Sequence, residues 1–343
     1  MKLSLYPFNL QLKHVFRISR DSQSEQATLV IELNDGRHNG FGEAPTDPFY
    51  EITIENLTNS LESIRTLLEP VRQIEPEIIW QQASELMPDN LFALSALDQA
   101  AYDLWGKQKG LPVYQLWGLD NADNVPSSFT IGIDEISQMV ERIVEVPDWP
   151  IYKIKLGTEN DIEIVRELRE HTKSLFRVDA NCGWNAEQTV HNSRILRTLG
   201  VEFIEQPLDP EDWDGAKYVF ENAMLPIIAD ESCVSEDDIE RCHKYFHGVN
   251  IKLCKCGGIT PARRMIKAAR ELCMKTMIGC MVESSVGISA IAQLLPMLDY
   301  VDMDGAELLR EDVATGVILE KGHCLYPEEN GTGAQLLQHC SIS

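Results

Sequence analysis

The sequence has no run of about 18 consecutive uncharged, apolar residues, which is the length that a membrane-spanning helix needs. Its first residues also lack the apolar stretch of a secretion signal. No cysteine occurs before Cys182, and the chain has nine, an odd number. A disulfide framework is therefore excluded, and free thiols in a reducing compartment are expected. We expect a cytoplasmic protein with no membrane partner.

Positive charge is scarce as well, since 30 Lys and Arg residues stand against 54 Asp and Glu residues, for a formal net charge of −24. A field of this sign repels phosphate backbones, so we expect no nucleic-acid partner. The 343 residues are 44 % hydrophobic and 24 % charged. This composition is that of a globular protein, and the length suits a large α/β barrel with an appended domain.

The first third of the chain combines hairpin and helix signals. Residues 27–33 and 37–41 have strand character and are joined at Asn34-Asp35-Gly36, a hairpin turn signal. Further on, apolar residues recur at intervals of three and four, namely at Leu94, Leu97, Ala101 and Leu104. This spacing predicts a helix that is stopped by Gly106, Gly110 and Pro112. We predict a small α+β domain over residues 1–122.

The middle of the chain alternates short β-type runs with helical segments. The eight runs are residues 129–133, 151–156, 176–179, 201–205, 226–230, 249–253, 276–279 and 300–303. One intervening helix is expected to begin with Thr260 as its N-cap and Pro261 in its first turn. Eight such units predict an α/β fold, a modified (β/α)8 TIM barrel over residues 123–308. The tail, residues 309–343, is expected to return to the first domain and to complete an α+β capping domain.

Carboxylates recur at the ends of three consecutive strands, where active sites of such barrels lie. They are Asp179, Glu205 and Asp230, spaced 26 and 25 residues apart. A single aspartate at a strand end is usually a helix cap, but three on neighbouring strands repel one another unless a cation lies between them. Carboxylate oxygens suit Mg²⁺, and the absence of His and Cys at these positions argues against zinc.

Lysines accompany these carboxylates. Lys153 and Lys155 alternate on one strand and should both face the barrel mouth, while Lys252 lies four strands further on and should approach from the opposite side. A neighbouring ammonium and a divalent cation lower a lysine pKa, which would make Lys155 and Lys252 usable as bases. Two bases that flank a metal-bound carboxylate can remove and return an α-proton on either face.

The sequence resembles the enolase superfamily, muconate-lactonizing subgroup, over essentially its whole length. The matching segments are residues 40–44 and 100–107, Lys153-Ile154-Lys155, Asp179-Ala180-Asn181, Glu205-Gln206-Pro207, Asp230-Glu231-Ser232 and Asn250-Ile251-Lys252 with Gly257-Gly258. The resemblance implies a capping domain on a modified barrel and one Mg²⁺ per subunit. It also implies that Asn181 and Glu231 support the metal ligands.

Within this superfamily, Asp302-Met303-Asp304-Gly305 resembles the dipeptide epimerases. In those enzymes the paired aspartates bind the substrate's terminal ammonium, and the metal takes the C-terminal carboxylate. Alternate residues of a strand place both carboxylates on one face, which suits an ammonium group. The resemblance also places five further residues in the substrate pocket: Lys153, Thr130, Cys280, Met281 and Glu283.

The same resemblance suggests a substrate preference. A mobile loop that closes over the C-terminal side chain matches residues 18–25, and relatives that prefer L-Ala-L-Glu carry an arginine where this chain has Gln23. A neutral amide does not offset the desolvation of a carboxylate as a guanidinium does. We therefore expect neutral or apolar dipeptides of the Ala-Ala or Ala-Val type. Arg20, in the same loop, is the alternative source of that charge.

The expected activity is thus an isomerase reaction, the Mg²⁺-dependent epimerisation of the C-terminal residue of a dipeptide. The alternatives are an L-Ala-D/L-Glu epimerase proper and, in the same superfamily, an N-acylamino-acid racemase, an o-succinylbenzoate synthase or a cycloisomerase, whose substrates need no aspartate pair. A non-catalytic barrel scaffold would not need the charged strand ends. The resemblance leaves a homo-oligomer open.

Overall fold

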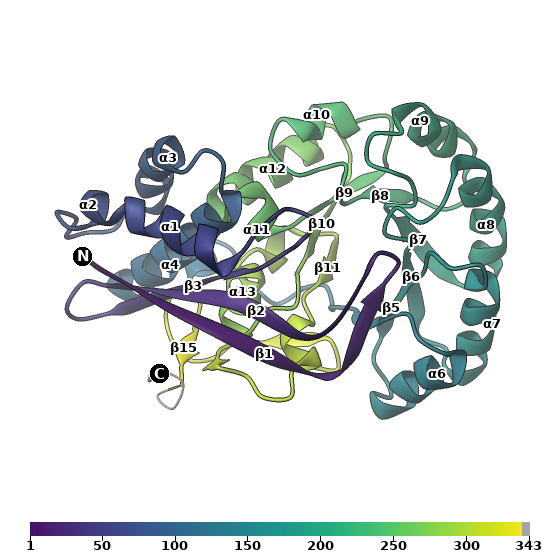
Figure 1. Ribbon diagram of the computed structural model, residues 1–343, viewed down its shortest axis with the longest axis horizontal. Coiled ribbons are helices and arrows are strands. Elements are labelled where there is room, and N and C mark those ends of the chain that lie inside the picture. The colour runs from purple at the N-terminus through teal and green to yellow at the C-terminus, as the bar shows by residue number, and fades with distance from the viewer. Residues whose placement is uncertain (338–343) are drawn as a thin grey trace.

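The computed structural model describes residues 1–337. An antiparallel three-stranded sheet with helices beside it lies against a curved eight-stranded parallel sheet (Figure 1). The three strands are β1 (Lys2–Ile18), β2 (Asp21–Asn34) and β3 (Asn39–Pro45). The predicted hairpin at Asn34-Asp35-Gly36 is confirmed, since β2 ends at Asn34 and Gly36 has a φ of 94°.

The hairpin of β1 and β2 is longer than the sequence pattern indicated. Pairing runs from Lys2 opposite Asn34 to Ile18 opposite Asp21, with an irregularity between Gln11 and Phe16. An alternating pattern of apolar residues marks only the half of β2 that packs against the helices of the same N-terminal part of the chain. The outer half is polar, and it extends away from them toward the barrel strands (Figure 1).

Five helices complete this part of the molecule: α1 (Ile54–Ser63), α2 (Arg65–Leu68), α3 (Pro76–Leu86), α4 (Leu91–Lys109) and α5 (Val113–Leu116). The expectation that Gly106 stops the long helix is wrong, because α4 continues through Gly106 and ends before Gly110, which has a φ of 72°. Gly106 instead permits a close approach of the C-terminal tail, since a Cβ there would lie 2.5 Å from the Cα of Gly331.

The barrel strands are β4 (Phe129–Ile131), β5 (Ile151–Lys155), β6 (Leu175–Asp179), β7 (Val201–Glu205), β8 (Ile227–Ala229), β9 (Gly248–Ile251), β10 (Lys275–Gly279) and β11 (Tyr300–Asp302). They hydrogen-bond in chain order. All eight predicted strands are present, which confirms the modified TIM barrel. An isolated bridge of Ser127, just before β4, with Val301 of β11 links the two edge strands, so the barrel is nearly closed.

Helices cover the outside of the barrel (Figure 1). They are α6 (Ile136–Glu145), α7 (Asp161–His171), α8 (Ala186–Thr198), α9 (Trp213–Asn222), α10 (Asp238–Cys242), α12 (Ile259–Glu271) and α13 (Ser285–Ala292). The short helix α11 (Leu253–Cys256) instead follows β9 and packs against α4. The 3-10 helices η1 (Leu295–Met297) and η2 (Gly305–Leu308) flank β11. Within residues 1–337, no helix combines the length and the apolar character required to cross a membrane.

Buried carboxylates of the first part join it to the barrel. Thr260 is not the N-cap of α12, as the sequence suggested, because Gly258 occupies that position. The amide and hydroxyl of Thr260 donate instead to Asp98 of α4, at 2.6 and 2.9 Å. Glu43 of β3 likewise accepts hydrogen bonds from the Ser284 amide at 3.1 Å and its hydroxyl at 2.5 Å, at the start of α13. These contacts satisfy helix N-termini across the junction.

The C-terminal tail contains the short strands β12 (Ala314–Thr315), β13 (Ile318–Glu320), β14 (His323–Leu325) and β15 (Gln335–Leu336). It contacts α4, where the Thr332 amide donates to Asp103 at 2.8 Å and the Lys107 ammonium donates to the Ala334 carbonyl at 3.0 Å. The division at residues 122 and 308 stays a prediction, and the end of the predicted tail, 338–343, lies outside the described residues.

Candidate active site

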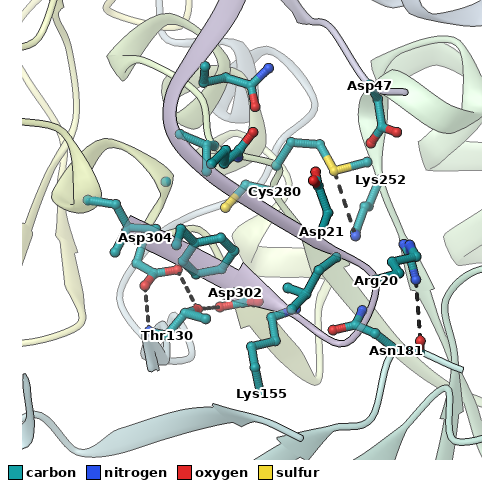
Figure 2. Close-up of a pocket in the computed structure, with 18 of the residues that line it drawn as sticks. Arg20, Asp21, Asp47, Thr130, Lys155, Asn181, Lys252, Cys280, Asp302 and Asp304 are labelled. Atoms are coloured by element: carbon teal, nitrogen blue, oxygen red, sulfur yellow. Dashed lines mark hydrogen bonds between the residues drawn. The ribbon is translucent and has the colours of Figure 1, made fainter. Parts of the chain in front are cut away.

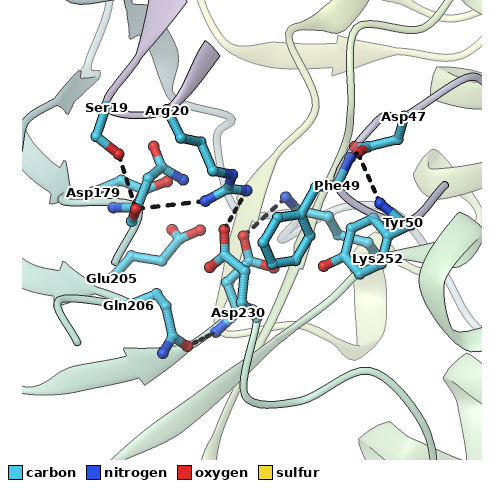
Figure 3. A network of polar contacts seen from close by, with 12 residues as sticks. Ser19, Arg20, Asp47, Phe49, Tyr50, Asp179, Glu205, Gln206, Asp230 and Lys252 are labelled. Carbon is cyan, nitrogen blue, oxygen red and sulfur yellow. Dashed lines mark hydrogen bonds and ion pairs between the residues drawn. The ribbon is translucent and has the colours of Figure 1, made fainter. Parts of the chain in front are cut away.

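Three buried carboxylates meet at the barrel mouth. Asp179 ends β6, Glu205 ends β7, and Asp230 directly follows β8. None of the three has exposed surface, and one oxygen from each lies within 4.8 Å of the others (Figure 3). Parallel strands bring their carboxyl ends to the same edge of the sheet, which explains why residues about 25 positions apart converge.

These oxygens fit a hard divalent cation. Glu205 Oε2 and Asp230 Oδ2 are buried and accept no hydrogen bond, although each lies about 3 Å from a lysine ammonium, at 3.0 and 2.9 Å. Burial, together with the charges of Asp179 and Asp230, raises the pKa of Glu205 to about 8, although Lys153 acts in the opposite direction. A cation among the three would relieve this repulsion, and an all-oxygen donor set is the type that Mg²⁺ prefers.

Two lysines contact this carboxylate triad from opposite sides. Lys155 ends β5, and its ammonium lies 2.7 Å from Asp179. Lys252 follows β9, four strands away in the sheet order, and its ammonium lies 2.9 Å from Asp230. Burial lowers the pKa of Lys252, but Asp230 and Glu231 outweigh it and hold the pKa well above its usual range. The lowering expected from the sequence therefore requires a cation that neutralises Asp230.

Two further side chains adjoin the carboxylate triad. Lys255 lies 2.5 Å from Asp230, and Asn250 donates to Glu205 at 2.8 Å. No local pattern marks Lys255. Asn250 lies in the segment Asn250-Ile251-Lys252 that resembles the superfamily, but the resemblance implies no role for it. Each of the two groups holds one carboxylate of the triad in place.

Lys153 lies deeper than Lys155, with about 1 % of its surface exposed. Its ammonium contacts Asp302 at 2.7 Å, Glu205 at 3.0 Å and Asp179 at 3.4 Å. It therefore connects the carboxylate triad to the aspartate pair of β11. A positive charge at this point balances part of the negative charge of both groups.

Asp302 and Asp304 lie at the seam between β11 and β4 (Figure 2). Asp302 accepts a hydrogen bond from the Ser128 hydroxyl at 2.8 Å, and Asp304 accepts one from the Thr130 amide at 2.6 Å. Burial raises the pKa of Asp304 well above its usual range, and the charge of Asp302 raises it further. A cationic group between the two carboxylates would relieve this repulsion.

A cavity, the main cavity, joins the lysines to the aspartate pair. Its lining contains most of the residues singled out in the sequence: Arg20, Gln23, Thr130, Lys153, Lys155, Asn181, Glu231, Lys252, Cys280, Met281, Asp302 and Asp304. Glu283 lies outside this lining. Its carboxylate accepts a hydrogen bond from the Met281 amide at 2.9 Å and packs against Gly287, and burial raises its pKa to about 8.

Several lining residues carried no signal in the sequence. They include Phe16 and Asp21 of the β1–β2 hairpin, Asp47 and Tyr50 after β3, and Leu308 of η2. Only the three-dimensional arrangement brings these segments to the barrel mouth, so no local pattern marks them. Asp21 is the exception, because it lies within the segment 18–25 that we expected to cover the substrate.

That segment is a hairpin tip in which only Ser19 and Arg20 lie between the strands. The expectation of a loop over residues 18–25 is therefore wrong for most of it, because Gln23 pairs with Phe16 in the β1–β2 ladder. The Arg20 guanidinium contacts Glu231 at 2.7 Å and lies 4.5 Å from the centre of the Phe49 ring (Figure 3). Its charge is thus already paired.

Asn181 and Glu231 both adjoin the carboxylate triad. The backbone amide of Asn181 donates to the Asp179 carboxylate at 2.9 Å, and the backbone carbonyl of Asn181 accepts a hydrogen bond from the Ser19 hydroxyl at 2.9 Å. Glu231 follows Asp230 and pairs with Arg20 as described. Both residues therefore connect the triad to the hairpin tip that covers it.

Known proteins with similar sequences and similar structures are named epimerases. An L-Ala-D/L-amino acid epimerase of Flavobacterium johnsoniae is 52% identical over 98% of this chain and 100% of its own length. A hydrophobic dipeptide epimerase of a Flavobacteria bacterium is 35% identical over 98% of both chains. The structure of a dipeptide epimerase from Cytophaga hutchinsonii, complexed with Mg and D-Ala-L-Val, is 25% identical with a TM-score of 0.92, and covers 98% of this chain and 95% of that one.

Two family descriptions match the chain. Residues 4–118 match the N-terminal domain of mandelate racemase and muconate lactonizing enzyme, and residues 135–339 match the enolase C-terminal domain-like family. The second match alone covers more than half of the chain. The chain therefore belongs to the mandelate racemase and muconate lactonizing enzyme family of the enolase superfamily.

Proposed function

We propose that this protein is a Mg²⁺-dependent isomerase that inverts the α-carbon of the C-terminal residue of a dipeptide by proton transfer between two lysines. The observation that carries the proposal is the arrangement along the main cavity. Lys155 and Lys252 face each other across a buried carboxylate triad, and an aspartate pair lies at one end of the same cavity.

Asp179, Glu205 and Asp230 would hold the Mg²⁺. When bound, the ion supplies electrophilic stabilisation of the negative charge that develops on the substrate carboxylate as the α-proton leaves. The solved structures of the Cytophaga hutchinsonii and Enterococcus faecalis dipeptide epimerases, both complexed with Mg, support this assignment.

The two lysines divide the proton transfer between them. In its neutral form, one lysine takes the α-proton from one face of the substrate, and the ammonium of the other lysine returns a proton to the opposite face. The α-carbon is inverted, and the reverse reaction uses the same groups in exchanged roles. Lys155 ends β5 and Lys252 follows β9, on opposite sides of the barrel, which supports the assignment of one base to each face of the α-carbon.

Asp302 and Asp304 would bind the free amino terminus of the dipeptide. Both carboxylates are buried, with 4 % and 2 % of their surface exposed, and Lys153 contacts Asp302. A neutral acyl group in place of the ammonium would therefore leave Asp304 without a cationic partner. Charge-assisted hydrogen bonds to an ammonium are the contacts this arrangement favours. The aspartate pair therefore supports a dipeptide substrate over an N-acylamino acid.

The charges at and near the hairpin tip favour a dipeptide whose second residue is neutral or apolar. Gln23 is uncharged, Arg20 is paired with Glu231, and Asp21 and Asp47 add negative charge to the lining. A glutamate side chain at this place would meet no free cation of the hairpin. The name of the 35% identical relative, hydrophobic dipeptide epimerase, agrees with a preference for apolar dipeptides.

The proposal extends to location and partners. The eight cysteines of the described residues are all free thiols, which supports a cytoplasmic location. The net charge of −24 supports a small-molecule substrate rather than a nucleic-acid or membrane partner. A homo-oligomer is compatible with the proposal.

A dipeptide library in D₂O tests the proposal. Mg²⁺-loaded protein should add one deuterium to neutral dipeptides with a small first residue, detected by mass spectrometry, and the matching N-acetyl dipeptides should remain unlabelled. Labelling of N-acylamino acids without labelling of any dipeptide would contradict the proposal and favour the racemase alternative.

A further inference from the structure

A second cavity, the side cavity, adjoins the main cavity. The two cavities share three lining residues, Phe16, Thr130 and Leu308. The side cavity lies under the stretch of β1 in which pairing with β2 is interrupted, between Gln11 and Phe16. Phe16, Thr130 and Leu308 therefore form a partition between the two spaces.

Phe16 faces inward because of the strand register. It lies opposite Gln23, and both residues line the main cavity, as do Ile18 and Asp21, the next inward pair. Between these pairs, Arg17 turns to the other side and contacts Asp134 at 2.8 Å. Side chains alternate between the two faces of a strand, so the register fixes Phe16 on the cavity face.

The backbone beside Phe16 is held against the barrel. The Ile133 amide donates to the Arg17 carbonyl at 2.8 Å. Gly132 lets this contact form, because a Cβ at that position would lie 3.2 Å from the Arg17 backbone and 3.3 Å from the Phe16 ring. The backbone next to Phe16 is thus anchored to the barrel.

The partition lies beside the proposed ammonium site. The Thr130 hydroxyl contacts Asp304 at 3.1 Å and Asp302 at 3.3 Å (Figure 2). In a dipeptide, the side chain of the first residue branches from the same carbon as the ammonium. When the ammonium of the substrate lies between the two aspartates, the side chain of its first residue therefore begins next to Thr130, close to Phe16 and Leu308.

The side cavity suits an uncharged side chain. Its walls include the apolar residues Val15, Phe129 and Val146. Several of its polar groups contact one another, as in the contacts of His14 with Glu145 at 2.9 Å and of Arg142 with Glu145 at 3.2 Å. The Lys13 ammonium donates to the backbone carbonyl of Glu307 at 2.7 Å. These contacts leave the apolar part of the wall as the surface offered to an uncharged side chain.

We propose that Phe16, together with Leu308, limits the first residue of the substrate to a small side chain, and that removal of the Phe16 ring opens the side cavity to large apolar first residues. This inference rests on the proposed dipeptide epimerase function. It assigns Phe16 as the residue that determines specificity for the first position, separately from Gln23 at its partner position on β2.

The test compares kcat/KM for Ala-Ala, Leu-Ala and Phe-Ala in the wild type, Phe16→Ala and the matched control Gln23→Ala. The wild type should favour Ala-Ala. Phe16→Ala should raise the ratio of Leu-Ala to Ala-Ala by about tenfold or more, the scale on which apolar pockets discriminate size. Gln23→Ala shortens the facing side chain without opening the side cavity, so it should change this ratio by less than about twofold on the same scale.

A second variant guards against misfolding. Leu308→Ala shortens the partition from the η2 side and should raise the Leu-Ala ratio in the same direction, with folding of each variant checked by circular dichroism. Unchanged ratios in active, folded variants would overturn the inference alone, as would a wild type that accepts Leu-Ala as well as Ala-Ala. A wild type that exchanges no dipeptide at all would overturn the proposed function and the inference with it.

Discussion

Replacement of Gln23 by arginine tests how the hairpin tip selects the second residue. Gln23 lines the main cavity and is neutral, while the neighbouring Arg20 guanidinium is held by Glu231 at 2.7 Å. A guanidinium and a carboxylate about 4 Å apart attract by about 4 kcal/mol at an effective dielectric constant of about 20. Desolvation and the side-chain entropy lost on binding offset much of this. A net gain of about 1.4 kcal/mol, or tenfold in kcat/KM for Ala-Glu relative to Ala-Ala, is expected.

Asp21 should reduce this gain. It lies on the same inward face of β2 as Gln23, two residues away, and would compete for the new guanidinium. The double variant Asp21→Asn with Gln23→Arg should therefore favour Ala-Glu more strongly than Gln23→Arg alone. Ser22→Arg is the matched control, because Ser22 pairs with the outward-facing Arg17 and adds the same charge away from the cavity.

The assay is the initial rate of epimerisation of Ala-Glu and Ala-Ala in direct competition. Ser22→Arg should shift the ratio by less than about twofold, because salt screens exposed charges beyond about 10 Å. An equal shift in Ser22→Arg and Gln23→Arg would show that only net charge matters. A wild type that already prefers Ala-Glu over every neutral dipeptide would refute the reasoning about Gln23.

Four further results are expected. Lys155→Ala and Lys252→Ala should each abolish epimerisation in a chirality assay, while D₂O exchange persists from one enantiomer only; wild-type exchange of both would exclude these lysines as the bases. EDTA should abolish activity and Mg²⁺ restore it, and Mg²⁺ at about 100 times its Kd should add about 2.7 kcal/mol of stability, seen as a higher Tm that Asp230→Asn lacks. N-acetylation should lower kcat/KM for Ala-Ala by about a hundredfold or more, since it removes a buried charge-assisted contact; equal turnover would contradict the role of Asp302 and Asp304. Burial raises the pKa of Asp98 to about 7. Because its folded pKa lies above the unfolded one, its stabilising contribution is complete below about pH 4 and is lost as the pH rises through 7. The stability difference between wild type and Asp98→Asn should therefore shift against the wild type from pH 5 to pH 8, and a constant difference would contradict the raised pKa.

The barrel could be predicted because its strands are buried on both faces and read as short apolar runs. Six of the eight strands end at or directly before a charged residue, so the spacing of Asp179, Glu205 and Asp230 located the site as well. These features depend on neighbouring residues along the chain. The shared edge of a parallel sheet then converts them into a three-dimensional cluster.

The features that the sequence did not reveal depend on distant partners. Thr260 is of a residue type that often caps helices, but Gly258 occupies the N-cap position. The Thr260 amide instead donates a hydrogen bond to the Asp98 carboxylate of α4. Glycine often ends a helix, but α4 continues through Gly106. The backbone of Gly331 in the C-terminal tail approaches so closely at this point that only a residue without a side chain fits. The outer half of the β1–β2 hairpin is polar and reads as a loop, so the place of Phe16 in the cavity wall could not be predicted locally.

The most direct test of the central claim is proton NMR of L-Ala-L-Ala incubated with Mg²⁺-loaded protein in D₂O. The account predicts loss of the α-proton signal of the second residue only, together with the appearance of L-Ala-D-Ala that carries deuterium at that carbon. Exchange at the first residue, or no exchange at either residue under conditions in which the protein is folded and Mg²⁺-bound, would contradict it.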